Sequence, residues 1–489
     1  MMRLDALIHD LPLSLAPEAT AVDVTGICHD SRRIVPGDLY VAIVGENHDG
    51  RRYVPEAVAR GAVAVLGPSS ELPTTVPWLA TESPRLLAGP LAARLCGHPD
   101  RRMTLIGVTG TNGKSTVTAL IAKVAEAAGK ATALLGTLGY HFGGRSYLEV
   151  GRTTPEAPDL FRILSRMADA GAEVAAMEVS SHALDFGRVA GALYDAAVFT
   201  NLSRDHLDYH GDFEQYFAAK AKLFEQLAAD GKAVINLGDP WGRRLAASYP
   251  DAVTWGEDGH VRVVSSHLTV SGTHARVDTP RGVLDLALPM VGRYHLENAL
   301  ATIALAEALA WPHAAVLAGL AQARPPMGRL EAIDAGQSFP VFVDFAHTPA
   351  GLEATLAALH EVLPERKIAL VFGCGGGRDR GKREPMGKAA GAGAVLPIAT
   401  SDNPRGEDPE AILAMVEVGL RASGNRHYRL VSDRREAIRQ AVSHARRSPA
   451  DWVVLVAGTG HETTQEIGDQ VLPFSDHDVL RRALEEGHG

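Results

Sequence analysis

Cysteine is scarce in this chain, and its scarcity excludes two classes of protein. The 489 residues include three cysteines, Cys28, Cys96 and Cys374, and no two of them are close in sequence. An odd and widely spaced set supports neither a disulfide framework nor a cysteine-rich zinc site. Free thiols are typical of a reducing compartment, so we expect a cytoplasmic protein.

Long apolar runs and an excess of basic residues are also missing. No apolar run approaches the roughly 18 residues of a membrane-spanning helix. Asp5, His9 and Asp10 interrupt the first residues, so we expect neither a membrane partner nor a signal peptide. The net charge of −10 argues against nucleic-acid binding, which needs clustered Lys and Arg. A local basic site could still bind the phosphates of a nucleotide.

The chain does contain alternating strand and helix patterns. Its length predicts about three domains at roughly 100–200 residues each. A helix at 53–60 separates two short apolar runs near the N-terminus, a helix is expected at 115–128, and residues 260–290 are typical of an antiparallel patch. The expected strands are 41–44, 62–66, 103–109, 172–178, 196–200, 341–343, 368–372, 395–399 and 452–457.

This alternation predicts an α/β protein of three domains with mostly parallel sheets. Residues 1–99 are expected to form a small N-terminal α/β domain, and residues 100–327 a central domain with a parallel sheet. The best linker candidate, 325–328, leads into a Rossmann-like α/β domain at 328–489.

The strongest local signal is GVTGTNGKST at 107–116, between an expected strand and an expected helix. Glycines let backbone amides close around phosphate oxygens, and the helix N-terminus adds a favourable partial charge. Lys114 can reach the β- and γ-phosphates. Val108 stands where a strict Walker A motif has glycine, and an ordinary glycine-rich turn is the alternative. The expected ATP loop comprises Gly110, Thr111, Asn112, Gly113, Lys114, Ser115 and Thr116.

Five further segments narrow the interpretation: DSR at 30–32, EVSSH at 178–182, TNLSRDHLDYHG at 200–211, DFAHTP at 344–349 and DNPR at 402–405. The loop resembles that of the muramyl ligases and the folylpolyglutamate synthetases. In their order and spacing, all the segments together resemble the muramyl ligase family from Asp30 to Glu462.

The resemblance implies an ATP-dependent, ADP-forming amide ligase of peptidoglycan precursor synthesis. It implies that meso-diaminopimelate is added to UDP-N-acetylmuramoyl-L-alanyl-D-glutamate by a monomer that uses ATP and Mg²⁺. It also implies that residues 1–99 bind the UDP-sugar, that residues 100–327 form a central ATP-binding domain like that of phosphate-loop ATPases, and that residues 328–489 bind the amino acid. The γ-phosphoryl group goes to the substrate carboxylate, the amine attacks the acyl phosphate, and phosphate leaves. Such chemistry depends on positioning and electrostatics.

The expected metal ligands are Ser115 or Thr116, Glu178 and His206. A carboxylate that ends a buried strand is costly unless it is paired or binds a cation. His206 and His210 lie four residues apart, as in some zinc sites, but no His-Glu-x-x-His motif is present.

The resemblance also identifies Lys220 as a lysine that becomes carbamylated, with Lys222 as the competing assignment. A carbamate replaces a cation with an anion, which could bind a second Mg²⁺. Lys114, Glu178, His206 and Lys220 therefore form the expected catalytic set.

The remaining contacts implied by the resemblance fall into three groups. The ATP group is Asn298, Arg329 and His347. The UDP-sugar-peptide group is Ser31, Thr153, Thr154, Ser181 and Arg188. The amino-acid group is Arg378, Asp402, Asn403, Arg405, Gly458 and Glu462.

Three positions depart from the family pattern. Phe345 stands where the family usually has Tyr, His295 where it has Asn, and Thr459 where it has Lys. The departure at Thr459 removes a positive charge near the pocket that is expected to bind the amino acid. Arg405 offers a guanidinium fork to the second carboxylate of diaminopimelate, and lysine would leave that fork unpaired.

A sibling ligase that acts on folate or another peptide fits the SSH segment at 180–182 and the DNPR segment at 402–405 less well. Two other rival interpretations stay open. One is the same reaction with L-lysine or L-ornithine as the third substrate. The other is a catalytically inactive scaffold that keeps the fold, which the intact set of Lys114, Glu178, His206 and Lys220 argues against.

Overall fold

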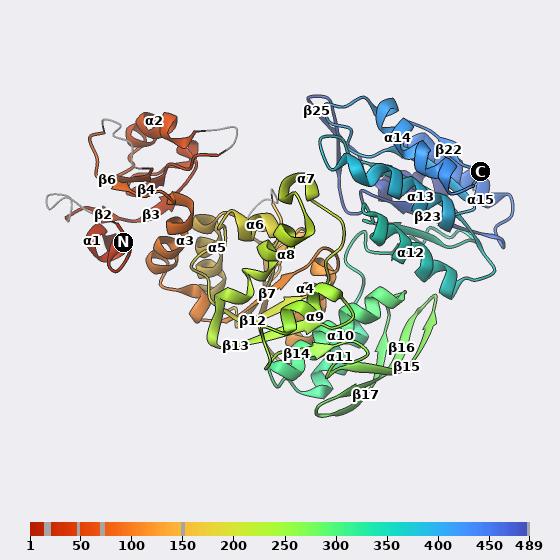
Figure 1. Cartoon of the computed structure of the whole chain (residues 1–489), viewed down its shortest axis with the longest axis horizontal. Coiled ribbons are helices and arrows are strands. Elements are labelled where there is room, and N and C mark those ends of the chain that lie inside the picture. Colours follow the sequence, from red (N-terminus) through yellow and green to blue (C-terminus); the bar gives the residue numbers. More distant parts are fainter. Residues whose placement is uncertain (14–20, 46–48, 69–73, 148–151, 487–489) are drawn as a thin grey trace.

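The protein is described by a computed structural model that covers residues 1–13, 21–45, 49–68, 74–147 and 152–486. Figure 1 shows three α/β units, with the N-terminal and C-terminal units on opposite sides of the central one. The predicted fold class is confirmed, whereas the domain boundaries after residues 99 and 327 stay predictions. Among the described residues, we find no helix with the length and apolar character that crossing a membrane requires.

The N-terminal unit is a parallel four-stranded sheet of order β3-β4-β5-β6. The predicted strand at 41–44 is wrong, because β4 ends at Val41. Beyond it Ala42 N still donates to Leu66 O of β5 at 2.8 Å, but the backbone of Ile43 bonds locally: its N donates to Val41 O at 3.1 Å, and its O accepts from Gly50 N at 2.8 Å. The elements are β1 Met2–Arg3, α1 Leu4–Ile8, β2 Asp23–Val24, β3 Gly26–Cys28, β4 Asp38–Val41, α2 Val54–Ala59, β5 Ala64–Gly67, β6 Trp78–Ala80 and α3 Pro84–Leu95.

The central unit is an eight-stranded sheet of order β10-β9-β8-β11-β7-β12-β13-β14, parallel from β8 to β14. Its strands are β7 Thr104–Thr109, β8 Thr132–Gly136, β9 Gly139–Phe142, β10 Arg145–Ser146, β11 Val174–Glu178, β12 Tyr194–Phe199, β13 Leu227–Asn236 and β14 Val253–Trp255. Its helices are α4 Lys114–Ala127, α5 Ala157–Asp169, α6 Ser181–Asp185, α7 Leu207–His210, α8 Phe213–Ala221, α9 Pro240–Ala246, α10 Arg293–Ala308 and α11 His313–Gln322.

Both faces of this sheet are buried, which explains the continuous apolar runs of its strands. On β7, Leu105 faces a core that also contains α5, whereas Ile106 faces a core built from α4, α10 and α11. The antiparallel patch predicted at 260–290 is confirmed as a three-stranded sheet of β15 Arg262–Thr269, β16 Gly272–Thr279 and β17 Gly282–Leu288.

The C-terminal unit is a six-stranded sheet of order β18-β19-β23-β20-β21-β22, in which only β18 is antiparallel. The strands are β18 Glu331–Ala332, β19 Val341–Asp344, β20 Lys367–Cys374, β21 Leu396–Ser401, β22 Arg429–Leu430 and β23 Trp452–Ala457, with a separate hairpin of β24 Thr464–Ile467 and β25 Gln470–Pro473. The helices are α12 Pro349–Val362, α13 Arg383–Gly393, α14 Pro409–Ala422, α15 Arg434–Arg446 and α16 Asp476–Glu485.

The sequence motifs occupy equivalent positions in the two larger sheets. The motif loops that start after residues 109, 178, 199, 344, 374, 401 and 457 all follow the carboxyl end of a parallel strand. Ligands bind outside the carboxyl ends of strands in open α/β sheets. The two larger sheets therefore present their motif loops as candidate binding edges.

Candidate active site

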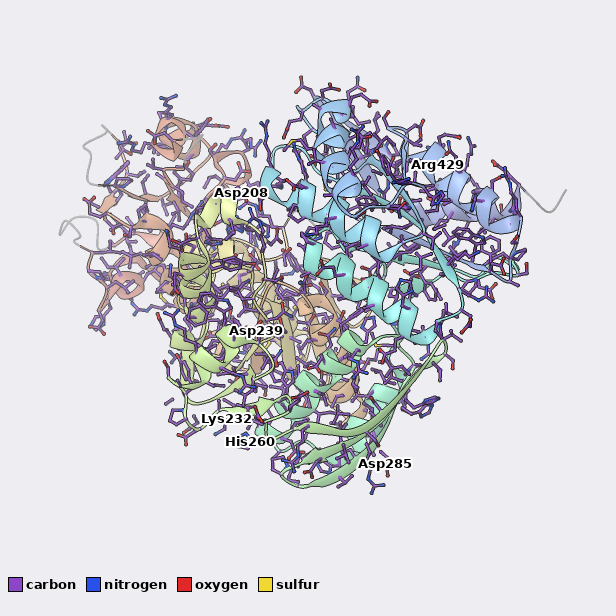
Figure 2. All side chains as sticks on the ribbon, turned by 45° about the vertical axis from the view of Figure 1, so that its right-hand side comes forward. Asp208, Lys232, Asp239, His260, Asp285 and Arg429 are labelled. Atoms are coloured by element: carbon purple, nitrogen blue, oxygen red, sulfur yellow. The ribbon has the colours of Figure 1, made fainter. Side chains whose placement is uncertain are left out.

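The motif loops of the central and C-terminal units line one cavity of about 570 Å³. Asp208, labelled in Figure 2 on α7 at the upper edge of the central unit, lines the same cavity. The predicted site residues that line it are Thr111, Asn112, Gly113, Lys114, Ser115, Thr153, Thr154, Glu178, Arg188, His206, Arg329, His347, Arg378, Asp402, Asn403, Arg405, Gly458 and Glu462. Residues that are far apart in sequence are thus brought together around one space.

The phosphate loop is closed by its own lysine. Lys114 Nζ donates to the carbonyls of Gly110 and Thr111, each at 2.9 Å. Gly113 has a φ of +87°, and a Cβ there would collide with Asn298 Oδ1, so only glycine fits. Burial lowers the pKa of Lys114, although the nearby Glu178 charge acts to raise it. The loop holds a cation where phosphate charge would be received.

Ser115 and Thr116 face different spaces. Ser115 lines the large cavity, whereas Thr116 lines a second cavity of about 240 Å³ with Asn298 and His295. Arg329 lines both cavities, and its guanidinium lies 4.7 Å from the centre of the Phe345 ring. The smaller cavity adjoins the phosphate loop and is lined mainly by the central unit and the start of α12.

Glu178 and His206 meet at the large cavity. Glu178 accepts hydrogen bonds from the backbone N and the Oγ1 of Thr137, at 2.9 and 3.1 Å. His206 has a φ of +53°, a strained conformation for a residue with a side chain and one that often marks functional sites. Burial lowers the pKa of His206 to about 3, although Asp205 acts to raise it. A neutral imidazole is the form that binds metals.

Asp205 also reaches across to the C-terminal unit. Its Oδ2 lies 3.6 Å from His347 Nε2 and 3.4 Å from His206 Nε2. A second pair, Arg204 with Asp379 at 3.4 Å, joins the same two units. Two contacts that each involve a carboxylate therefore join the central and C-terminal units across the cavity.

Lys220 and Lys222 have different surroundings, and the structure favours Lys220 as the site residue. Lys220 is buried and donates to Gly110 O at 2.8 Å, beside Lys114. Burial and the Lys114 charge hold the pKa of Lys220 well below its usual value. Lys222 instead forms a partly exposed pair with Asp185 at 2.7 Å.

Only some of the residues expected to bind the UDP-sugar peptide line the large cavity. Thr153, Thr154 and Arg188 line the cavity, whereas Ser181 is buried behind it and hydrogen-bonds His210 at 3.0 Å. Ser31 does not line this cavity: it lies in the N-terminal unit and donates to Glu56 at 2.9 Å.

Two lining residues, Thr137 and Arg152, have no predicted role, and two more, His182 and Lys382, lie in segments noted in the sequence but were not predicted as site residues. Arg152 directly precedes the predicted Thr153, and its Nη1 lies 2.5 Å from the buried Glu156 carboxylate, which Arg188 also approaches at 3.1 Å. Only its neighbour in sequence could have drawn attention to Arg152.

The amino-acid group forms a charged wall in the C-terminal unit. Asn403 Nδ2 donates to Asp402 at 3.2 Å and to Glu462 at 2.7 Å. Burial and the Asp402 charge raise the pKa of Glu462. Arg405 Nε pairs with Glu466 at 2.7 Å and its Nη1 donates to Gly376 O at 3.0 Å, so two of its nitrogens are already engaged.

Arg378 differs from Arg405 in its exposure and in its hydrogen bonding. It is exposed in the cavity, and within the described residues we find no hydrogen bond or ion pair for it. Its whole guanidinium fork is therefore available for an anion.

Known protein families match most of the chain. The Mur ligase family catalytic domain matches residues 23–84, the Mur ligase middle domain residues 108–306, and the Mur ligase glutamate ligase domain residues 328–460. A relative from Solibacter usitatus is 41% identical over 485 residues, which is 98% of this chain and 97% of the relative. The chain belongs to the Mur ligase family.

Other relatives and solved structures agree with this membership. A Synechococcus elongatus protein is 43% identical and covers 99% of each chain. It and the Solibacter protein are named UDP-N-acetylmuramoyl-L-alanyl-D-glutamate--2,6-diaminopimelate ligase. A solved structure of that name has a TM-score of 0.71 at 32% identity and covers 100% of this chain and 99% of its own.

A more distant structure shows the fold alone. Mycobacterium tuberculosis folylpolyglutamate synthase, solved with ADP and AMPPCP, has a TM-score of 0.63 at 23% identity, over 75% of this chain and 91% of its own. The matching families and the full-length relatives, and not this structure, confirm the family resemblance inferred from the motifs and with it an ATP-dependent ligase.

Proposed function

We propose that this chain adds meso-diaminopimelate to UDP-N-acetylmuramoyl-L-alanyl-D-glutamate in peptidoglycan precursor synthesis, as a monomer in the cytoplasm. One observation carries the proposal: a single cavity joins the phosphate loop to a wall of arginines and carboxylates in another unit. The names of relatives at 41% and 43% identity support the substrates. The domain limits 1–99, 100–327 and 328–489 belong to the same proposal.

The reaction needs three substrates in line. A carboxylate oxygen of the UDP-linked peptide attacks the γ-phosphorus of ATP, and ADP leaves. The amine nitrogen then attacks the acyl carbon, loses a proton, and phosphate leaves. Lys114 would exchange the carbonyls of Gly110 and Thr111 for phosphate oxygens and neutralise their developing charge. Thr153, Thr154 and Arg188 would hold the peptide beside it.

The nucleotide base would occupy the smaller cavity. That cavity meets the phosphate loop at Gly113 and is lined by Asn298 and Arg329. Thr116 faces this space and not the large one, so the proposal assigns it to nucleotide binding and Ser115 to the metal. His347 would approach the nucleotide from the C-terminal unit. It already lies 3.6 Å from Asp205 of the central unit.

The residues present fit a Mg²⁺ ion. Ser115, Glu178 and His206 line one cavity next to Lys114, and they offer a hydroxyl, a carboxylate and a neutral imidazole. Oxygen donors are the ligands that Mg²⁺ prefers. When bound, the ion would neutralise charge on the transferring phosphoryl group.

Lys220 is suited to carbamylation. Its lowered pKa favours the neutral amine, which is the form that reacts with CO₂. The nitrogen forms a bond to carbon, a proton leaves, and a carbamate anion results. Beside Lys114, the carbamate anion would form an attractive pair with the lysine cation, whereas a protonated Lys220 would repel it.

The C-terminal wall would hold the diamino acid. Arg378 can receive one carboxylate with its whole guanidinium fork, and Arg405 can receive the other with Nη2, because its Nε and Nη1 are engaged. Asp402 and Glu462 can receive an ammonium group. Lysine and ornithine lack the second carboxylate, so they would leave a guanidinium unpaired at a cost of about 1–3 kcal/mol. Diaminopimelate should therefore be preferred at least about tenfold.

Product analysis tests this function. Purified protein is given MgATP, the UDP-linked dipeptide and, separately, diaminopimelate, L-lysine and L-ornithine, and each product is identified by mass. A tripeptide product with diaminopimelate at the highest kcat/KM is expected. Equal use of lysine would contradict the substrate assignment, and no product with any amino acid would favour an inactive scaffold.

A further inference from the structure

Thr459, the position where the family pattern has lysine, turns away from the cavity. Its Oγ1 donates to Asp476 and accepts a hydrogen bond from Arg434 Nη2 at 3.2 Å. Thr459 itself is buried and is absent from the cavity lining. The cation behind this loop is Arg434, at the start of α15.

The Arg434 guanidinium is fixed on one side and unpaired on the other. Nε and Nη2 donate to Asp476 at 2.8 and 2.7 Å, and Nη2 also donates to Ala457 O at 3.0 Å. Both side chains of the ion pair have no exposed surface. Nη1 is also buried and finds no hydrogen-bond partner among the described residues. Such a group is costly, which points to a role for that edge of the side chain.

The unpaired Nη1 lies directly behind the wall of the amino-acid pocket. Gly458, with a φ of +118°, forms this part of the wall. Around the position that a Cβ of Gly458 would take, Asp402 Oδ2 lies at 2.9 Å and Arg434 Nη1 at 3.9 Å. Because no side chain intervenes there, the guanidinium and the Asp402 carboxylate approach the same spot.

We propose that Arg434 is a positioning residue of the amino-acid pocket, whose buried charge holds Asp402 and Glu462 together to receive the ammonium group of the diamino acid. The inference rests on the proposed function. Asn403 ties the two carboxylates to one amide, where their like charges repel. A fixed cation behind Gly458 offsets that repulsion.

The electrostatic surroundings of Arg434 agree with this role. Burial acts to lower its pKa, but the charges of Asp476, Asp402 and Glu462 raise it above the usual value. A merely structural ion pair would involve Asp476 alone and would hold α15 to α16 without affecting the pocket.

A double substitution tests the proposal in the full-length chain. Arg434→Met with Asp476→Leu removes both charges at similar volume, a change that buried pairs often tolerate. We expect the KM for diaminopimelate to rise about tenfold, while the KM for ATP changes less than twofold. Arg446→Met is the matched control: it lies on the same helix and donates to the carbonyl of Ala483 at 2.9 Å, away from the pocket.

A conservative substitution keeps the test decisive if the double variant does not fold. Arg434→Lys retains the charge but cannot hold Asp476 with two nitrogens and also reach Gly458, so a smaller, severalfold rise in the KM for diaminopimelate is expected. An unchanged KM in a folded variant, or equal rises for diaminopimelate and ATP, would overturn the inference. A wild-type chain that makes no tripeptide would instead overturn the proposed function.

Discussion

The two halves of the large cavity hold their charges in different ways. In the central unit, Lys114 and Lys220 donate to backbone carbonyls of the phosphate loop, and Glu178 accepts from Thr137. In the C-terminal unit, Arg378 has no partner within the described residues, and Arg434 keeps an unpaired Nη1.

This difference separates two tasks. The central half is organised by its own backbone, as transition-state stabilisation of phosphoryl transfer requires. The C-terminal half keeps charges available for a ligand. Substitutions in the central half should therefore lower kcat, whereas those in the C-terminal half should raise the KM for the amino acid.

The largest effect is expected at Lys114. Lys114→Ala should lower kcat by roughly 10²–10³-fold, because it removes the cation that meets the transferring phosphoryl group. Lys123→Ala, on the exposed side of the same helix, is the control. Steady-state kinetics with a circular-dichroism check of folding measures this, and normal turnover in a folded Lys114→Ala protein would remove the loop from the mechanism.

The second-largest fall in kcat is expected on substitution of Lys220. Lys220→Ala should lower kcat by roughly 10²-fold, as the loss of a group that supports a metal site does. Short carboxylic acids should partly restore activity by supplying the missing anion, and wild-type activity should fall after CO₂ removal and return with bicarbonate. Lys222→Ala should behave like the wild type, and equal losses in both variants would contradict the assignment.

Substitutions in the C-terminal half are expected to raise the KM for the amino acid. Arg378→Ala and Arg405→Ala should each raise the KM for diaminopimelate about tenfold, since one carboxylate loses a charged partner. The KM for ATP should hardly move, and Arg421→Ala on the surface should leave both values unchanged. A fall in kcat without a rise in the KM for diaminopimelate would break the proposed division of tasks.

The smallest effect concerns stability and not catalysis. Burial lowers the pKa of His295 to about 3, below an unfolded value of about 6.5. The stability linked to this group is present above pH 6.5 and is lost as the pH falls toward 3. His295→Asn should reduce the fall in unfolding free energy between pH 7 and pH 5 by about 2 kcal/mol. Denaturant unfolding at both pH values measures this, and an identical fall would contradict it.

The sequence predicts the strand ends that carry the motif loops in both halves, but not the side chains that reach the cavity from other segments, such as Thr137 and Arg152. Strand ends such as Thr109 and Glu178 follow from local patterns, because an apolar run followed by glycine or a carboxylate is visible within a few residues. The predicted strand at 41–44 is wrong because β4 ends at Val41 and the backbone of Ile43 forms local hydrogen bonds, which leave no such pattern in the sequence.

Contacts between distant residues were not predictable. Arg434 and Asp476 are 42 residues apart on separate helices, and nothing in either segment signals the pairing. The engagement of Arg405 by Glu466 likewise depends on a hairpin that packs back onto the loop. Ser115 and Thr116 are adjacent in sequence, so only the structure shows that they face different cavities.

The central claim is that both halves of one cavity act on the same carboxylate, and isotope transfer tests it most directly. The UDP-linked dipeptide is labelled with ¹⁸O in its D-glutamate carboxylates and incubated with protein, MgATP and diaminopimelate. The account predicts one ¹⁸O atom in each phosphate released and a tripeptide product that has lost that atom, because the carboxylate oxygen leaves with the phosphoryl group. Tripeptide formation with unlabelled phosphate, or ATP hydrolysis without tripeptide, would contradict it.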